Sequence, residues 1–200
     1  MSHSDKLTYG RMLFGAPTVL IILNRAVDQE GIQALALYFF SFFFLLAWEI
    51  TDILDGRLAR KRGETSNLGK VSDPLADVML HLPIYLFMVM VSWVPWWMFM
   101  INMMREVFIT GARTIVATIG NGEAVGSKLP GKIKTWGYAI SQLWLILYHG
   151  LLSSGIEIPY GLEISWWLLF TTTALCLYTW ITYGHFFVYK IHGYNRKFPT

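Results

Sequence analysis

The sequence has few charged residues for its length. Of its 200 residues, 14% are charged and 54% are hydrophobic, whereas soluble domains usually contain about 25% charged residues. Several apolar stretches approach the roughly 20 residues that an α-helix needs to cross the hydrocarbon core of a bilayer. This composition argues against a soluble globular protein and favours a helical protein that crosses a membrane several times.

Cysteine and long polar stretches are also scarce. The one cysteine, Cys176, lies within an apolar run, and a single cysteine excludes an intramolecular disulfide. The longest polar stretch, 59–72, is only as long as a loop, which excludes a separate soluble domain. We therefore expect residues 1–200 to form one integral-membrane domain of the all-α class.

The apolar segments predict a bundle of six membrane-spanning helices. With six spans both termini lie on one side, and 15 of the 16 basic residues fall on that side, Arg25 being the exception. Because cytoplasmic loops are enriched in Lys and Arg, we expect both termini to face the cytoplasm, in a cell inner membrane or its equivalent. The expected spans cover residues 13–24, 33–54, 75–94, 96–119, 133–152 and 164–189.

Four aspartates stand where the second expected span ends and the third begins. Asp52 and Asp55 are three residues apart, and Asp73 and Asp77 are four apart, so each pair lies on one face of its helix. The connecting loop is short, which predicts that the four carboxylates gather near the cytoplasmic face. Carboxylate oxygens are preferred ligands of Mg²⁺ and Mn²⁺, and two such ions can clamp a pyrophosphate. Taken alone, Asp73 followed by Pro74 also fits a helix N-cap with proline at the first helical position.

The aspartates belong to a longer pattern with eight specified positions. It resembles the signature of the CDP-alcohol phosphotransferase family. The resemblance implies a six-span membrane enzyme, usually a homodimer, whose site faces the cytoplasm. It also implies a reaction in which an alcohol attacks the phosphate next to the lipid of a CDP-linked donor, so that CMP leaves. The pattern reads Asp52-x2-Asp55-Gly56-x2-Ala59-Arg60-x8-Gly69-x3-Asp73-x3-Asp77.

The resemblance also implies roles for single residues. Asp77 would bind metal and act as the general base that takes the proton of the alcohol. The other metal ligands implied are Asp52, Asp55 and Asp73, and the residues implied to line the CMP pocket are Gly56, Ala59, Arg60 and Gly69. The small residues among them also have a simpler explanation, because they favour close helix packing.

A second polar cluster bears on the acceptor alcohol. Arg105-Glu106 and Arg113 lie in the fourth expected span, with the arginines about two turns apart on one face. Lys132 and Lys134 open the fifth. Arginine and lysine side chains at a membrane face suit a phosphate, but Arg105 could instead pair with Glu106 or Glu123, and the cluster could contact lipid headgroups.

This cluster is similar to one branch of the family, the phosphatidylglycerophosphate synthases. The similarity covers about residues 5–140, and Asp5 and Val78 depart from the branch pattern. It implies CDP-diacylglycerol as donor, glycerol 3-phosphate as acceptor, membrane lipids as surroundings and no nucleic-acid partner. The residues that carry it are Leu7-Thr8-x2-Arg11, Pro17, Arg105-Glu106, Arg113 and Gly131-Lys132-Ile133-Lys134-Thr135.

Three other hypotheses stay open at the level of sequence. The same family could use another acceptor, such as inositol phosphate or serine. A divalent-cation transporter would place its carboxylates near the middle of the membrane on broken helices, and a non-catalytic lipid-binding scaffold would not need Asp77. His81, one turn after Asp77, could support a metal site, although a histidine satisfied by a neighbouring side chain is the commoner arrangement.

Overall fold

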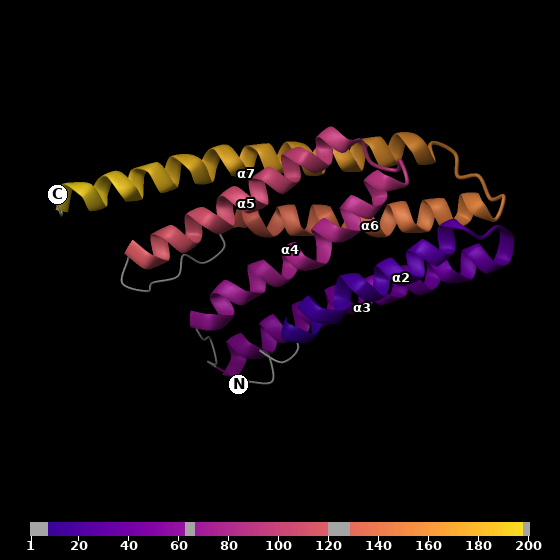
Figure 1. Ribbon diagram of the computed structural model, residues 1–200, viewed down its shortest axis with the longest axis horizontal. Coiled ribbons are helices and arrows are strands. Elements are labelled where there is room, and N and C mark those ends of the chain that lie inside the picture. The colour runs from indigo at the N-terminus through magenta and orange to yellow at the C-terminus, as the bar shows by residue number, and fades with distance from the viewer. Residues whose placement is uncertain (1–7, 63–66, 120–128, 198–200) are drawn as a thin grey trace.

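The computed structural model describes residues 8–62, 67–119 and 129–197. Side chains at 55–73, 114, 116–132, 186 and 188–200 are outside the description. Every element in the described ranges is helical, and because η1 continues directly into α2, these ranges form six helical rods (Figure 1). The elements are η1 (Arg11–Gly15), α2 (Ala16–Val27), α3 (Gly31–Arg62), α4 (Asn67–Met90), α5 (Trp96–Ile119), α6 (Leu129–Ser153) and α7 (Gly161–Lys197).

The described helices follow the expected segments in order but extend beyond several of them. The bounds of α5 match the expected segment 96–119, whereas α3 continues to Arg62 and α4 begins at Asn67. Hydropathy marks only the apolar part of a helix, while good helix formers such as Arg and Lys continue the same helix beyond that part. As a result Pro74 lies inside α4, so the interpretation of Asp73-Pro74 as a helix start is wrong.

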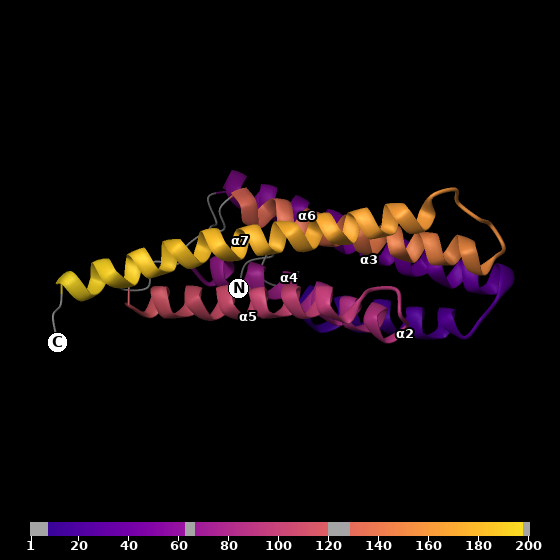
Figure 2. The ribbon, with the colours of Figure 1, turned by 90° about the horizontal axis from the view of Figure 1, so that it is seen from above.

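The rods lie lengthwise beside one another. Helix α3 packs against α2 and α6, α7 packs against α5 and α6, and α4 contacts η1, α2, α5 and α6. The two views in Figures 1 and 2 show that α3, α5 and α7 run toward the same end of the bundle, where α4 and α6 begin. The polar ends of α3, α5 and α7 therefore lie at that end, spread apart from one another in both views.

The interior of the bundle is filled by large side chains from several helices. Leu45, Leu80, Tyr85, Tyr138 and Ile146 are fully buried in one hydrophobic core. Helices α3 and α6 approach closely at Gly150, where a β-carbon would lie 2.6 Å from Tyr38 Cβ. A side chain at this position would push the two helices apart, so the absence of one sets their spacing.

The outer surface is largely apolar. Large hydrophobic side chains such as Phe40, Val107 and Trp167 are each more than 60% exposed. Two helical segments in the described ranges are long and apolar enough to cross a membrane, Gly31–Leu54 and Gly161–His185. Only 22% and 33% of their most apolar windows are buried, so these segments are not enclosed core helices.

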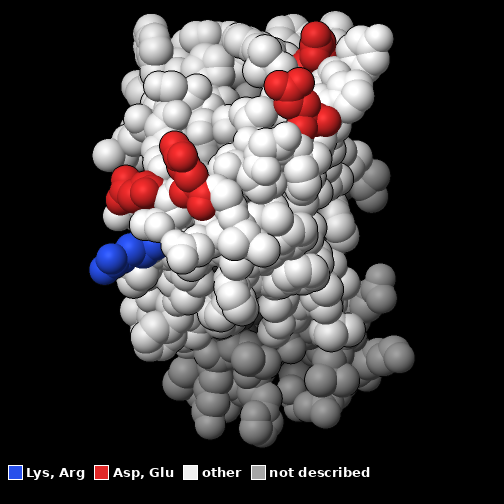
Figure 3. Space-filling view, turned by 90° about the vertical axis from the view of Figure 1, so that its right-hand side faces the viewer, with Lys and Arg blue, Asp and Glu red and all other residues white. Residues whose placement is uncertain are grey.

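The two ends of the bundle differ in charge. Figure 3 shows the end formed by the turns around residues 28–30, 91–95 and 154–160, where acidic side chains outnumber basic ones. The basic residue in this region is Arg25, close to Asp28 and Glu30 in sequence. Arg113 lies in the second half of α5 and Lys134 near the start of α6, both nearer the opposite end, and Arg105 lies near the middle of α5.

Candidate functional site

The described aspartates of the motif meet at one arginine. Arg11, in η1, contacts Asp52 of α3 through Nη1 and lies 3.3 Å from Asp77 of α4 through Nη2. The Arg11 side chain is 5% exposed, while Asp52 and Asp77 are 41% and 25% exposed. Two carboxylates from different helices are therefore close enough to share one cation, as the short connection between α3 and α4 predicted.

The local structure of the N-terminal helix puts Arg11 in this position. Residues 11–15 form one turn of π-helix before α2 begins, and such turns often occur at functional sites because they redirect a side chain. Gly15, at the end of this turn, lets the chain approach α4, since a β-carbon there would lie 3.0 Å from Leu80 Cδ1. The close approach brings Arg11 against the acidic ends of α3 and α4.

The donor set at this point fits a divalent cation. Carboxylate oxygens are the ligands that Mg²⁺ and Mn²⁺ prefer. Asp55 is one turn beyond Asp52 on α3 and Asp73 is one turn before Asp77 on α4, although their side chains lie outside the description. Among the side chains that are described, no group of three or more His, Cys, Asp or Glu is placed to hold a metal ion. Metal binding by the four aspartates therefore stays a prediction.

His81 on α4 and Glu49 on α3 each lie one turn from a motif aspartate, and His81 is hydrogen-bonded to Gln142 of α6. The side-chain amide of Gln142 donates from Nε2 to the His81 carbonyl oxygen and accepts at Oε1 from His81 Nδ1, both at 2.8 Å. His81 Nε2 lies 3.5 Å from Glu49 Oε1. His81 thus has neighbouring side chains as partners. This confirms the interpretation of His81 as a histidine satisfied by a neighbour.

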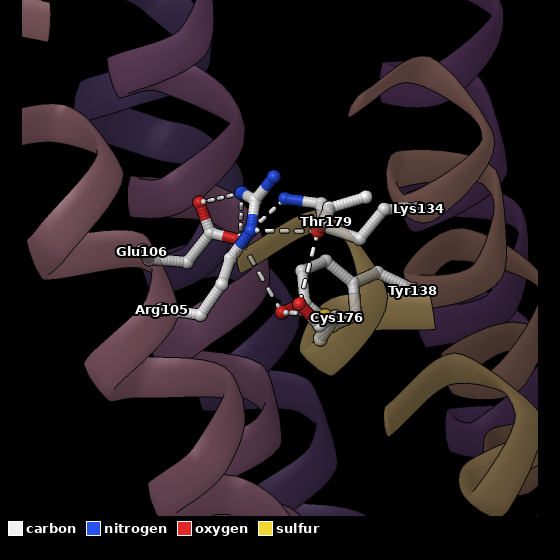
Figure 4. Close-up of polar contacts among 6 residues, drawn as sticks. All are labelled: Arg105, Glu106, Lys134, Tyr138, Cys176 and Thr179. Atoms are coloured by element: carbon white, nitrogen blue, oxygen red, sulfur yellow. Dashed lines mark hydrogen bonds and ion pairs between the residues drawn. The ribbon is translucent and has the colours of Figure 1, made fainter. Parts of the chain in front are cut away.

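A second polar cluster joins α5 and α6 around one glutamate. Arg105 donates from Nη1 to both carboxylate oxygens of Glu106, at 2.9 and 3.0 Å, and Lys134 Nζ also contacts Oε1 (Figure 4). These three residues are 3–4% exposed. Tyr138 donates its hydroxyl to the same carboxylate at 3.3 Å. Of the alternatives left open by the sequence, pairing of Arg105 with Glu106 is confirmed.

Both arginines of α5 lie on one face, as their spacing of eight residues predicted, and that face meets α7. Arg105 donates from Nε to Thr179 Oγ1 at 3.1 Å, and the Arg113 guanidinium lies over the Tyr183 ring, 5.5 Å from its centroid. Arg105 Nη2 and Arg113 Nε are buried, and neither has a hydrogen-bond partner within the described part of the chain. Buried donors of this kind are costly unless a ligand or water satisfies them.

The structure therefore brings two subsets of the expected residues together. Asp52 joins Asp77 through Arg11, and Arg105 joins Lys134 through Glu106. The sequence interpretation missed Arg11 as part of the acidic site, although its place in the Leu7-Thr8-x2-Arg11 pattern was the available signal. It also missed the contact of Tyr138 with Glu106. The expected residues whose side chains lie outside the description are Asp55, Gly56, Ala59, Arg60, Gly69, Asp73 and Lys132.

Comparison with known families identifies the class of protein to which this arrangement belongs. The model of the CDP-alcohol phosphatidyltransferase family matches residues 1–188. The matched region includes the acidic site on α3 and α4 and the basic cluster on α5 and α6. The chain is a member of this family.

Individual relatives carry a more specific name. A CDP-diacylglycerol--glycerol-3-phosphate 3-phosphatidyltransferase of Bacillus subtilis is 36% identical over 131 residues, which cover 66% of each chain. Proteins of the same name from Treponema pallidum and Escherichia coli K12 are 37% and 30% identical over 101 and 100 residues, covering 50% and 48% of this chain. The matched segments span 46–66% of the length of these relatives.

Proposed function

We propose that the protein is an integral-membrane phosphatidyltransferase that makes phosphatidylglycerophosphate from CDP-diacylglycerol and glycerol 3-phosphate and releases CMP. The observation that carries the proposal is that one member of this family contains both an acidic site on α3 and α4 and a basic cluster on α5 and α6. Carboxylates from α3 and α4 share one cation, and buried cationic donors from α5 and α6 meet at Glu106. The names of the relatives support the choice of donor and acceptor.

The acidic site suits the donor half of the reaction. Asp52, Asp55, Asp73 and Asp77 would hold two Mg²⁺ or Mn²⁺ ions, which supply positive charge for the pyrophosphate and for the departing CMP. Gly56, Ala59, Arg60 and Gly69 occupy the same parts of α3 and α4 and would line the CMP pocket. Asp77 would accept the proton of the acceptor hydroxyl. The hydroxyl oxygen would then bond to the phosphorus next to the lipid as the bond from that phosphorus to CMP breaks.

The basic cluster suits the acceptor half of the reaction. Arg105 Nη2 and Arg113 Nε are buried donors without a partner among the described residues, and phosphate oxygens are suitable acceptors for such donors. Lys134 is held by Glu106 and would present its remaining N–H groups to the same anion, with Lys132 nearby in sequence. Since Glu106 neutralises one of two adjacent cations, the cluster keeps a net positive charge toward the phosphate.

The surface supports a membrane location. The exposed large hydrophobic side chains on α3, α5 and α7 would be unfavourable in water and suit contact with lipid. We propose six spans, with the active site and both termini cytoplasmic, because the end bearing Arg25 is otherwise acidic. A homodimer is proposed from the family resemblance. A cysteine introduced at Ser2 should resist an impermeant thiol reagent in intact cells and react after the cells are opened, while buried Cys176 stays unlabelled.

The decisive experiment is release of CMP by the purified protein. CDP-diacylglycerol and Mg²⁺ are supplied, and glycerol 3-phosphate, inositol phosphate or serine is added in turn, with the lipid product identified by mass. We expect CMP and phosphatidylglycerophosphate to form only when glycerol 3-phosphate is the alcohol that is added. Release with another alcohol instead would change the acceptor and keep the donor chemistry. No CMP with any alcohol, together with divalent-cation flux through reconstituted vesicles, would favour the transporter.

A further inference from the structure

The contact of Arg11 with both aspartates has a consequence for cation binding. Arg11 contacts an oxygen of Asp52 through Nη1 and lies 3.3 Å from an oxygen of Asp77 through Nη2. The positive charge of Arg11 repels a divalent ion from both carboxylates, and the Asp52 oxygen in contact with Nη1 has less lone-pair density to offer to that ion. The same carboxylates cannot serve both partners fully.

The position of Arg11 makes this competition hard to avoid. The side chain is 5% exposed, and neither Nε nor Nη2 makes a hydrogen bond in the described part of the chain. Asp52 and Asp77 are the ion-pair partners of Arg11 in the described part of the chain, so release from them would leave a nearly buried guanidinium to find new acceptors. The oxygens of a bound pyrophosphate are suitable acceptors of this kind.

We infer that Arg11 acts as an internal counter-cation that competes with the divalent ion for Asp52 and Asp77. It is a positioning residue: it holds the two carboxylates together between catalytic cycles and lowers the affinity of the site for metal alone. Metal binding is then favoured when a substrate that carries phosphate arrives to accept the displaced guanidinium. This inference rests on the divalent-ion site of the proposed function.

The test is the affinity of the purified protein for Mn²⁺, measured by the paramagnetic resonance signal of free Mn²⁺ without donor or acceptor. Arg11→Gln removes the competing charge. We expect this variant to bind Mn²⁺ at least about 10-fold more tightly than the unmodified protein, a factor that corresponds to the lower estimate for one charge-assisted hydrogen bond. Arg11→Lys keeps the charge but not the fork that reaches two carboxylates, so its affinity should fall between the two. Arg25→Gln, an exposed change on the adjoining helix α2, is the matched control and should leave the affinity unchanged.

Thermal unfolding gives a second reading. In chelator, Arg11→Gln should unfold at a lower temperature than the unmodified protein, because Asp52 and Asp77 repel each other without a cation. Saturating Mn²⁺ should bring the unfolding temperature of Arg11→Gln most of the way back to that of the unmodified protein, because the ion binds the folded state. If the unmodified protein binds Mn²⁺ and both Arg11 variants bind it equally or more weakly, the inference about Arg11 is overturned and the proposed metal site stands. Absence of Mn²⁺ binding by the unmodified protein would overturn it together with the proposed metal site.

Discussion

Replacing Glu106 by glutamine tests the central feature of the basic cluster. The change keeps the size of the side chain and one accepting oxygen but removes the negative charge. Arg105 and Lys134 are 3–4% exposed, and both contact the Glu106 carboxylate. Without that charge, two adjacent buried cations face each other and a neutral amide.

The expected cost follows from the loss of a buried ion pair. Removing one partner of such a pair typically destabilises a protein by about 3–5 kcal/mol, because the remaining charge stays buried without compensation. The retained oxygen of glutamine can still accept one hydrogen bond, and each such bond to a charged group contributes about 1.5–3 kcal/mol. We therefore expect Glu106→Gln to lower the free energy of unfolding by about 3 kcal/mol, at the lower end of the range.

The assay is denaturant-induced unfolding in mixed detergent micelles, followed by tryptophan fluorescence. Glu157→Gln is the matched control, because Glu157 is exposed in the turn between α6 and α7. Adding Lys134→Met to Glu106→Gln removes one cation together with the anion and returns the cluster to its original net charge. The double variant should be more stable than the sum of the two single changes predicts, by at least about 1.5 kcal/mol. A Glu106→Gln effect no larger than that of Glu157→Gln, or strict additivity of the pair, would refute the assignment of Glu106 as the shared counter-ion.

Three further outcomes are expected. Asp77→Asn should lower the rate of CMP release by at least about 100-fold while the protein stays folded, because a general base contributes at least that much; a near-normal rate would remove Asp77 from this role. Arg113→Ala should lower kcat/KM for glycerol 3-phosphate by roughly 10- to 150-fold, the value of one charge-assisted hydrogen bond, with little change in the KM of the donor; equal losses for both substrates would contradict an acceptor role. Gly150→Ala should destabilise the bundle by about 1–3 kcal/mol through its clash with Tyr38, whereas Gly184→Ala, which meets nothing within 4 Å, should be neutral or slightly stabilising in the same unfolding assay.

The order and approximate position of the helices could be predicted from sequence because they follow from local composition. Each expected apolar segment falls on a helix in the part of the chain that the structure describes, and the bounds of α5 were predicted to the residue. The ends of α3 and α4 were not, since polar residues continued both helices past their apolar segments. The N-cap interpretation of Asp73-Pro74 failed for the same reason: a local signal was outweighed by a helix that had already begun at Asn67.

Helical spacing and a short connection were also enough to predict that the acidic residues of α3 and α4 approach each other. Both properties are local, because they depend on the spacing of residues along one helix and on the length of one connection, so they could be read without the tertiary structure. The partners of the charged groups were decided by tertiary structure. Arg11 reaches Asp52 across 41 positions, and Lys134 reaches Glu106 across 28, through the packing of η1 on α4 and the arrangement of α5 and α6. A buried charge pairs with whichever opposite charge the packed helices bring within a few ångströms, and that distance is a property of the whole bundle rather than of any local pattern.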